Sequence, residues 1–98
     1  MSEWKFLDPP NVAVVIDSRI AKNSYWIARV LHDAEDGAWQ FHVDAIEYPG
    51  EIQPILISLR SATQLDPSIV ELSSLPLGWQ AWRTSVTSAW NLEPQRSV

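Results

Sequence analysis

Two histidines and three carboxylates in the middle of the chain are the residue types from which metal sites are built. His32 is followed by Asp33, Glu35 and Asp36, and His42 comes six residues after the last of these acids. The spacing of the acids matches no twelve-residue calcium loop and lacks its final glutamate. If the segment is a hairpin, the two histidines lie on opposite faces. We therefore predict no metal site and interpret the three acids as a solvated turn.

The motifs of common catalytic sites are missing from the sequence. It contains no Gly-x-Ser-x-Gly elbow, phosphate-binding loop or His-Glu-x-x-His helix. The three glycines, Gly37, Gly50 and Gly78, are too far apart to form a phosphate cradle. Asp17 and Asp44 form an acid–base pair only if the fold brings them together. We predict no catalytic residue and no cofactor; a small ligand-binding domain or an enzyme of unknown reaction is the alternative.

Tryptophan is the residue type that stands out, with six copies in 98 residues. Trp79, Trp82 and Trp90 lie within twelve residues of one another, and Arg83 follows the second of them. Two interpretations stay open: the rings cover the second face of a sheet, or they anchor a partner, because Trp and Arg are enriched at the centres of interfaces. The candidate partner-binding residues are Trp79, Trp82, Arg83 and Trp90, with Asp33, Glu35 and Asp36 as steering charges.

Composition restricts the class of partner and the compartment. Seven Lys and Arg residues against twelve Asp and Glu residues give a net charge of −5, which disfavours nucleic acids and anionic membranes and favours a basic protein surface. The chain has no cysteine, which excludes disulfides and cysteinyl metal sites and favours the cytoplasm. The start has no apolar signal region, and the longest aliphatic run, Val12–Ile16, is too short to span a bilayer. We expect a cytoplasmic protein.

The chain length predicts one domain over 1–98, with an N-terminal segment over 1–10 and a flexible tail over 91–98. Apolar runs predict strands over 11–17, 25–32, 39–43 and 55–59, separated by a polar turn over 18–24 and a loop over 45–54. The sequence Asp36-Gly37 indicates a tight hairpin turn. If Asp33 pairs with Ala38, one face of that hairpin is apolar. The opposite face then carries Tyr25, Ile27, Arg29, Leu31, Gln40, His42 and Asp44.

One or two helices are expected after the fourth strand. Asp66 can cap a short helix whose first position is Pro67, where no N–H is needed. The spacing of Trp79, Trp82, Val86 and Trp90 predicts a second helix or an irregular arm over 79–90. The predicted fold class is therefore α+β: a four-stranded, mainly antiparallel sheet with one or two short C-terminal helices on one face.

The order of several motifs resembles a small bacterial family of unknown function. The resemblance covers roughly residues 12–90, and its strongest pieces are the Trp-Gln-Phe strand and the Leu-Pro-Leu-Gly-Trp turn. The matching positions are Arg19-Ile20, His32-Asp33, Asp36-Gly37, Trp39-Gln40-Phe41, Asp66-Pro67-Ser68, Glu71-Leu72, Leu75-Pro76, Gly78-Trp79, Ala81, Arg83 and Trp90.

More distantly, the Arg-Ile turn and the Asp-Gly-x-Trp-Gln-Phe hairpin are similar to an immunity-type domain of bacterial polymorphic-toxin systems. This resemblance implies a protein that binds and silences a toxin, with no catalytic residue to carry over. We therefore expect a non-enzymatic protein-binding domain whose partner is a basic protein such as a toxin. A second copy of the chain, in a homodimer, is the other partner considered.

Overall fold

The first strand, β1 (Ala13–Asp17), comes from the β-branched run of the sequence. Val14 and Ile16 are buried, whereas Ala13 is exposed, because successive strand residues point to opposite faces. The computed structural model describes residues 3–22 and 24–96. After β1 comes the short helix α1 (Ser18–Ala21), where we expected an irregular turn.

The hairpin of β2 (Arg29–His32) and β3 (Trp39–His42) has the predicted register. Val30 lies opposite Phe41, His32 lies opposite Trp39, and Asp33 N–H donates to the carbonyl of Ala38 at 2.9 Å. Val30, Trp39 and Phe41 are buried on the same face. The prediction of one apolar hairpin face is confirmed, although β2 is shorter than the expected strand over 25–32.

The fourth strand, β4 (Pro54–Ser58), leads directly into helix α2 (Leu59–Leu65), which the sequence did not indicate. The hydroxyl of Ser58 accepts a hydrogen bond from Ser61 N–H at 3.0 Å and caps the new helix. Strand and helix therefore meet without a connecting loop.

The 3₁₀ helix η1 (Pro67–Leu72) begins as the sequence predicted. The carboxylate of Asp66 accepts from Ser68 N–H at 3.0 Å, and Pro67 occupies the first helical position. Within residues 3–22 and 24–96, no helix has the length and apolar composition needed to cross a membrane.

The predicted helix over 79–90 is wrong. Trp79–Trp82 form strand β5, and Asn91–Pro94 form strand β6. Trp79 and Trp82 are an odd number of residues apart, so a strand places them on opposite faces instead of one helical face. Asn91–Pro94 belong to the segment that we expected as a flexible tail, and they pair with β5.

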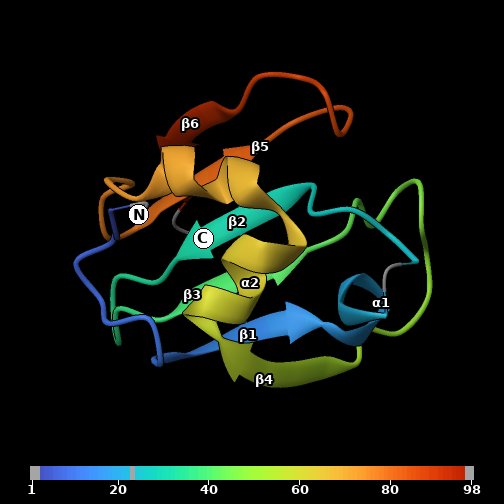
Figure 1. Cartoon of the computed structure of the whole chain (residues 1–98). Helices are drawn as coiled ribbons and strands as arrows, with labels where there is room; N and C mark the ends of the chain where they lie inside the picture. The colour runs from blue at the N-terminus through green and yellow to red at the C-terminus, as the bar shows by residue number, and fades with distance from the viewer. Residues whose placement is uncertain (1–2, 23, 97–98) are drawn as a thin grey trace.

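The six strands form one mixed sheet in the order β4-β1-β3-β2-β5-β6 (Figure 1). β1 and β3 are parallel, and every other neighbouring pair is antiparallel. The expected four-stranded sheet is therefore wrong: β5 and β6 extend it to six strands, and the parallel pairing of β1 with β3 makes it mixed. The expected C-terminal helices are also misplaced: α2 and η1 precede the last two strands.

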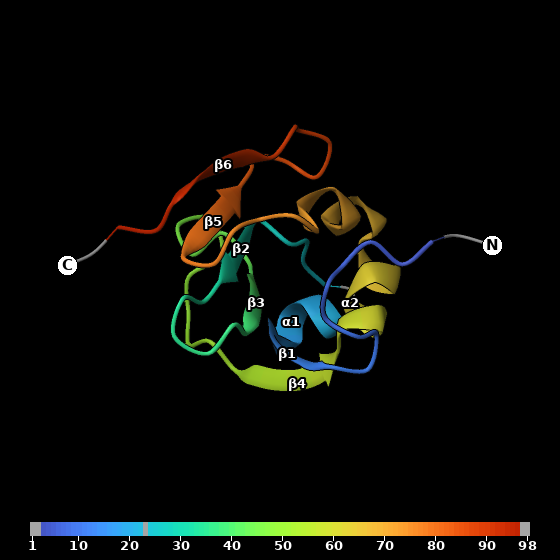
Figure 2. The same cartoon turned by 90° about the vertical axis from the view of Figure 1, so that its left-hand side faces the viewer.

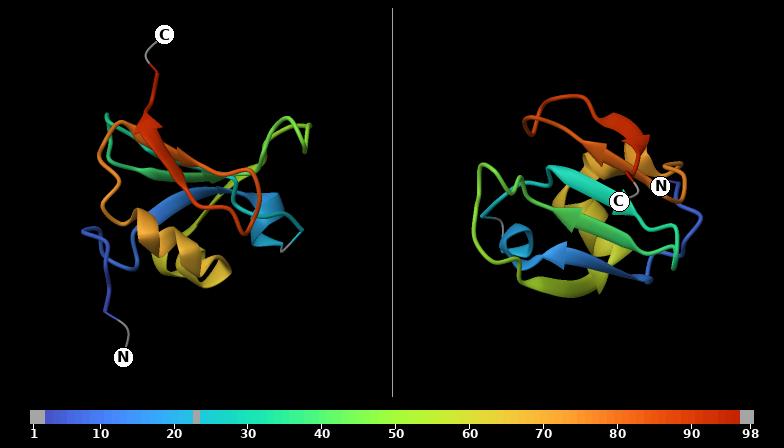
Figure 3. Two further views of the ribbon diagram at one scale, coloured as in Figure 1. Left: turned by 90° about the horizontal axis from the view of Figure 1, so that it is seen from above. Right: turned by 180° about the vertical axis from the view of Figure 1, so that it is seen from behind.

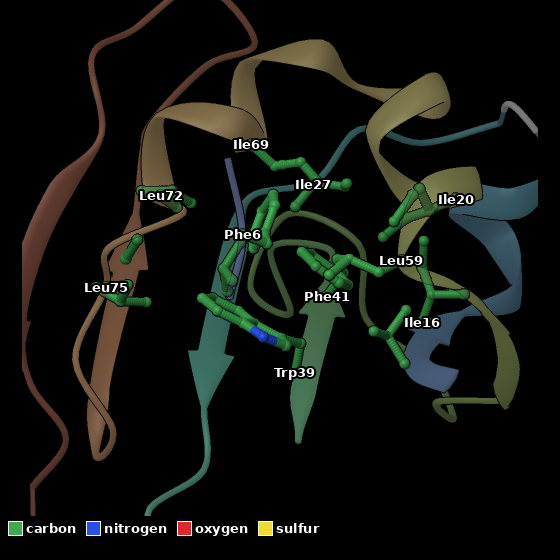
Figure 4. Packing of buried hydrophobic residues seen from close by; sticks show 14 of the residues in the cluster. Phe6, Ile16, Ile20, Ile27, Trp39, Phe41, Leu59, Ile69, Leu72 and Leu75 are labelled. Carbon is green, nitrogen blue, oxygen red and sulfur yellow. The ribbon is translucent and has the colours of Figure 1, made fainter. Parts of the chain in front are cut away.

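The core lies between one face of the sheet and α2 with η1 (Figures 1 and 4). The N-terminal segment completes it: the Phe6 ring packs edge-on against Trp39, with 5.3 Å between centroids. The other face of the sheet carries none of the helices that residues 3–22 and 24–96 form, and it is the face seen in the right-hand view of Figure 3. We call it the open face. The labelled core residues in Figure 4 are Phe6, Ile16, Ile20, Ile27, Trp39, Phe41, Leu59, Ile69, Leu72 and Leu75.

Candidate functional site

The three clustered tryptophans do not share a surface. Trp79 and Trp90 are partly buried and pack against the core. Trp82 is 39% exposed and lies on the open face, because it is in register with Arg29 of β2. Of these three candidates, Trp82 is the exposed one.

Arg83 lies inside the protein, with 3% of its surface exposed. Its guanidinium donates to the carbonyl of Ile27 at 2.9 Å and to the Ser68 hydroxyl at 3.0 Å, and it forms an ion pair with Asp66. It also lies over the ring of Trp90, 4.2 Å from the centroid. Arg83 therefore joins the segment before β2 to η1 and to the segment before β6.

The acidic turn is held by its own carboxylates. Asp33 accepts from the N–H of Glu35, and Asp36 accepts from the N–H of Ala38, both at 2.8 Å. Glu35 and Asp36 are exposed. Across residues 3–22 and 24–96, no three His, Asp or Glu side chains are placed to hold a metal ion. The acids are at the end of the hairpin far from Trp82, so the structure does not bring the two groups of candidates together.

The turns over 33–37 and 75–79 are in contact with each other. Gly78 N–H donates to the carbonyl of His32 at 2.7 Å. Gly78 has a φ of 79°, and a Cβ on it would lie 3.4 Å from the Cβ of Ala34. A ligand has no room between these turns.

A groove of about 680 Å³ lies on the open face. Strand pairing places Trp82, Arg29 and His42 side by side across β5, β2 and β3, with Asp17 of β1 also in the lining. A second, smaller depression shares Arg29 and continues toward the C-terminal end. The open face therefore carries one extended trough.

A hydrogen-bonded chain of polar side chains forms part of the floor. The Nε and Nη2 atoms of Arg29 donate to the Oε1 of Gln80 at 3.0 and 2.8 Å. The amide of Gln80 donates in turn to the carboxylate of Glu93 at 3.0 Å. This chain connects β2 to the edge strand β6 and fixes the orientation of the Arg29 guanidinium.

Arg19 positions the loop over 44–53, which forms one wall of the groove. Its guanidinium binds the buried carboxylate of Asp17, with Nη2 and Oδ2 2.8 Å apart, and donates to the carbonyl of Tyr48 at 3.3 Å. The side-chain hydrogen bonds from Arg19 are the largest cause that lowers the pKa of Asp17, although burial opposes them. Asp17 and Asp44 both line the groove, but Arg19 neutralises Asp17.

The surroundings of His42 disfavour its charged form. Burial of the ring, followed by the positive charge of Arg29, lowers the pKa of His42, and the carboxylate of Asp17 opposes this shift. The Nε2 of His42 is 3.0 Å from the amide oxygen of Gln40 on the same face. The groove therefore presents a fixed cation, Arg29, beside an imidazole whose charged form is disfavoured.

Exposed aliphatic side chains lie on the groove wall formed by the loop. Ile46 and Ile52 are 94% and 53% exposed, and both line the groove with Trp82. Hairpin parity predicted that Arg29, Gln40 and His42 lie on the face opposite the apolar one, and they do. The sequence pattern did not indicate Gln80, Glu93 and the two isoleucines. Their positions depend on the pairing of β5 with β2 and on the loop over 44–53, which folds over the open face.

Comparison of the chain with protein-family models, with curated proteins and with solved structures finds no match.

Proposed function

We propose that this chain is a non-enzymatic protein-binding domain that holds its partner on the open face of the sheet. The observation that carries the proposal is the groove, in which exposed Trp82, Ile46 and Ile52 surround the fixed Arg29. An exposed tryptophan next to an arginine is the composition of an interface anchor. Exposed apolar side chains around a concave surface also mark interaction sites.

The state of the polar groups favours a macromolecular partner over a small substrate. Small-molecule sites use a few convergent polar groups to orient the ligand. Here Arg29, Gln80 and Glu93 bind one another, and Asp17 binds Arg19. Among the described residues, no buried side-chain nitrogen or oxygen lacks a hydrogen-bond partner. The exposed apolar side chains are therefore the groups that gain most from being covered.

The specific form that we propose is an immunity-type protein in the cytoplasm that occludes a basic toxin. The resemblance of the hairpin motif suggests this role, and the absence of cysteine favours the compartment. The net charge of −5 and the exposed acids at the end of the hairpin steer a basic partner toward the protein. Trp82 then anchors the partner in the groove, so that binding is steric and electrostatic and needs no catalytic group.

The test is capture of a partner from a lysate of the source cells by the tagged protein and by two variants. Trp82→Ala removes the proposed anchor, and Val86→Ala is the matched control, because Val86 is 57% exposed and does not line the groove. We expect one stoichiometric protein to bind the wild type and Val86→Ala, and to be lost with Trp82→Ala. Circular dichroism and the midpoint of urea unfolding verify that both variants stay folded.

Neutralising the acidic turn tests the electrostatic part. The variant Asp33→Asn/Glu35→Gln/Asp36→Asn keeps acceptor oxygens for the turn hydrogen bonds while it removes three charges. We expect slower association with the captured partner, and the difference from wild type should shrink at high salt because exposed charges are screened. No captured partner, or a partner that binds Trp82→Ala as well as the wild type, would contradict the proposal.

A further inference from the structure

β4 is an edge strand with the features of an unprotected one. It pairs with β1 alone and lies along one margin of the sheet in Figures 1 and 2. Leu56 and Ile55 are 69% and 39% exposed, and the strand Pro54–Ser58 contains no charged residue. Proteins protect edges with charges, prolines or very short strands. β4 has only Pro54, at its first position, whereas β6 (Asn91–Pro94) has both Glu93 and Pro94.

The register against β1 shows which backbone groups of β4 face outward. Leu59 N–H donates to the carbonyl of Val12, and Ser18 N–H donates to the carbonyl of Gln53, both at 2.9 Å. Hydrogen-bonded pairs alternate along an antiparallel ladder, so Ile55 and Ile57 are the next pairs bound to β1. The N–H and C=O of Leu56 therefore point away from the sheet.

We propose that β4 pairs with β4 of a second copy of this chain, antiparallel and around a two-fold axis at Leu56. In this register Leu56 faces Leu56 of the second copy, Ile55 faces Ile57, and Pro54 faces Ser58. The two Leu56 residues exchange both of their outward hydrogen bonds, and each Ser58 N–H donates to the carbonyl of the opposite Pro54. An isologous contact of this kind is the usual basis of a homodimer.

The ends of β4 fit each other in this register. Pro54 has no N–H to donate to Ser58 of the second copy. The carbonyl of Ser58 is not left unpaired by this missing donor. Ser58 is the N-cap of α2, so its carbonyl accepts the first hydrogen bond of that helix. Side-chain pairing is also matched: leucine meets leucine on one face and isoleucine meets isoleucine on the other. A partner strand with a charge at any of these positions would fit less well.

The geometry of the dimer has a consequence for the open face. The two-fold axis of an antiparallel strand pair is perpendicular to the sheet, so the sheet continues from one copy into the other. Both open faces then lie on the same side, and both sets of helices lie on the other. The dimer does not depend on a partner in the groove, so it can be tested apart from the proposed function.

A single cysteine gives a direct test, because the chain has no other. Hydrogen-bonded residues in antiparallel strands have Cα atoms about 5.5 Å apart, within the range that a disulfide spans. We expect Leu56→Cys to form a disulfide-linked dimer under mild oxidation much faster than Val86→Cys, which places a thiol at another exposed position. Equal rates for the two variants would overturn the proposal.

Amide hydrogen exchange tests the hydrogen bonds themselves in the unmodified chain. In a monomer the outward amide of Leu56 exchanges fast at every protein concentration. In the dimer its protection rises with protein concentration, by up to about tenfold over about a hundredfold increase, because mass action lowers the monomer fraction with the square root of concentration. The amide of Ile57, which bonds to β1 in the monomer, is the internal control. Concentration-independent exchange at Leu56, with a single monomeric species in sedimentation, would refute the dimer.

A proline variant separates the backbone bond from the side chain. Leu56→Pro removes the outward N–H and leaves the β1–β4 ladder intact, and Pro94 already occupies such a position on the other edge. We expect this variant to remain folded and monomeric. If Leu56→Pro still dimerises like the wild type, the contact does not use β4.

Discussion

Replacing Arg83 by methionine tests whether this residue belongs to the interior or to an interface. Methionine keeps an unbranched apolar stem in place of the arginine stem and removes the charge and all donors. The carbonyl of Ile27 loses the guanidinium donor, and the hydroxyl of Ser68 keeps only the donor from Trp90. The carboxylate of Asp66, 17% exposed, loses its counter-ion. A partner-binding Arg83 would instead leave the folded state unaffected.

The expected cost follows from the burial of the pair. The side chain of Arg83 is 1% exposed, and removing one member of a buried ion pair destabilises a protein by about 3–5 kcal/mol. An exposed pair contributes only about 0–1 kcal/mol. Each kcal/mol lowers the melting temperature of a domain of this size by about 4–8 °C, so we expect Arg83→Met to melt at least about 12 °C below the wild type.

Urea unfolding followed by circular dichroism measures the free energy of unfolding of Arg83→Met, Asp66→Asn and the double variant. We expect the double variant to be more stable than the two single losses predict, by about 1–3 kcal/mol, because it leaves no uncompensated charge. Arg60→Met is the control, since Arg60 is exposed, and it should change stability by less than about 0.5 kcal/mol. A cost below about 1 kcal/mol for Arg83→Met would refute the structural role.

Two further predictions concern His42 and the glycine turns. The pKa of His42 is lowered in the folded state, so its contribution to the free energy of unfolding is complete above the ordinary pKa of 6.5 and decreases as the pH falls below it. His42→Gln lacks this titrating group. When the pH is lowered from about 7.5 to about 5.5, its melting temperature should therefore fall by less than that of the wild type. Gly78→Ala should cost about 1–2 kcal/mol because of its positive φ. In urea unfolding it should cost more than Gly37→Ala, where the nearest atom to an added Cβ is the flexible end of Leu77 at 3.9 Å.

Local signals account for the parts of the fold that the sequence predicted. The Asp36-Gly37 turn and the alternation of Trp39-Gln40-Phe41 specify a register in which a slip of one residue would expose Trp39 and Phe41. Asp66 and Pro67 start η1 through their own capping chemistry. In each case the residues that determine the structure lie within a few positions of one another.

The errors arose where distant segments decide the structure. Trp79, Trp82 and Trp90 satisfy a helical spacing, but pairing with β2 and β6 makes the first two a strand. The acceptors for Arg83 come from Ile27, Ser68 and Asp66, and no local pattern relates these residues to it. The groove was partly predictable, since hairpin parity placed Arg29 and His42 on one face.

The exposed apolar side chains indicate a binding surface on the groove wall and the free edge of the sheet, whereas the number of tryptophans had suggested the segment over 79–90. Trp79 and Trp90 pack against the core, because a large ring in a small domain is one of the best ways to bury apolar area. The aliphatic side chains that remain exposed are informative because folding does not require them. Four of these, Ile46, Ile52, Ile55 and Leu56, lie within eleven consecutive residues that form the wall of the groove and the free edge of the sheet. Substitutions there should change association while the free energy of unfolding stays near that of the wild type.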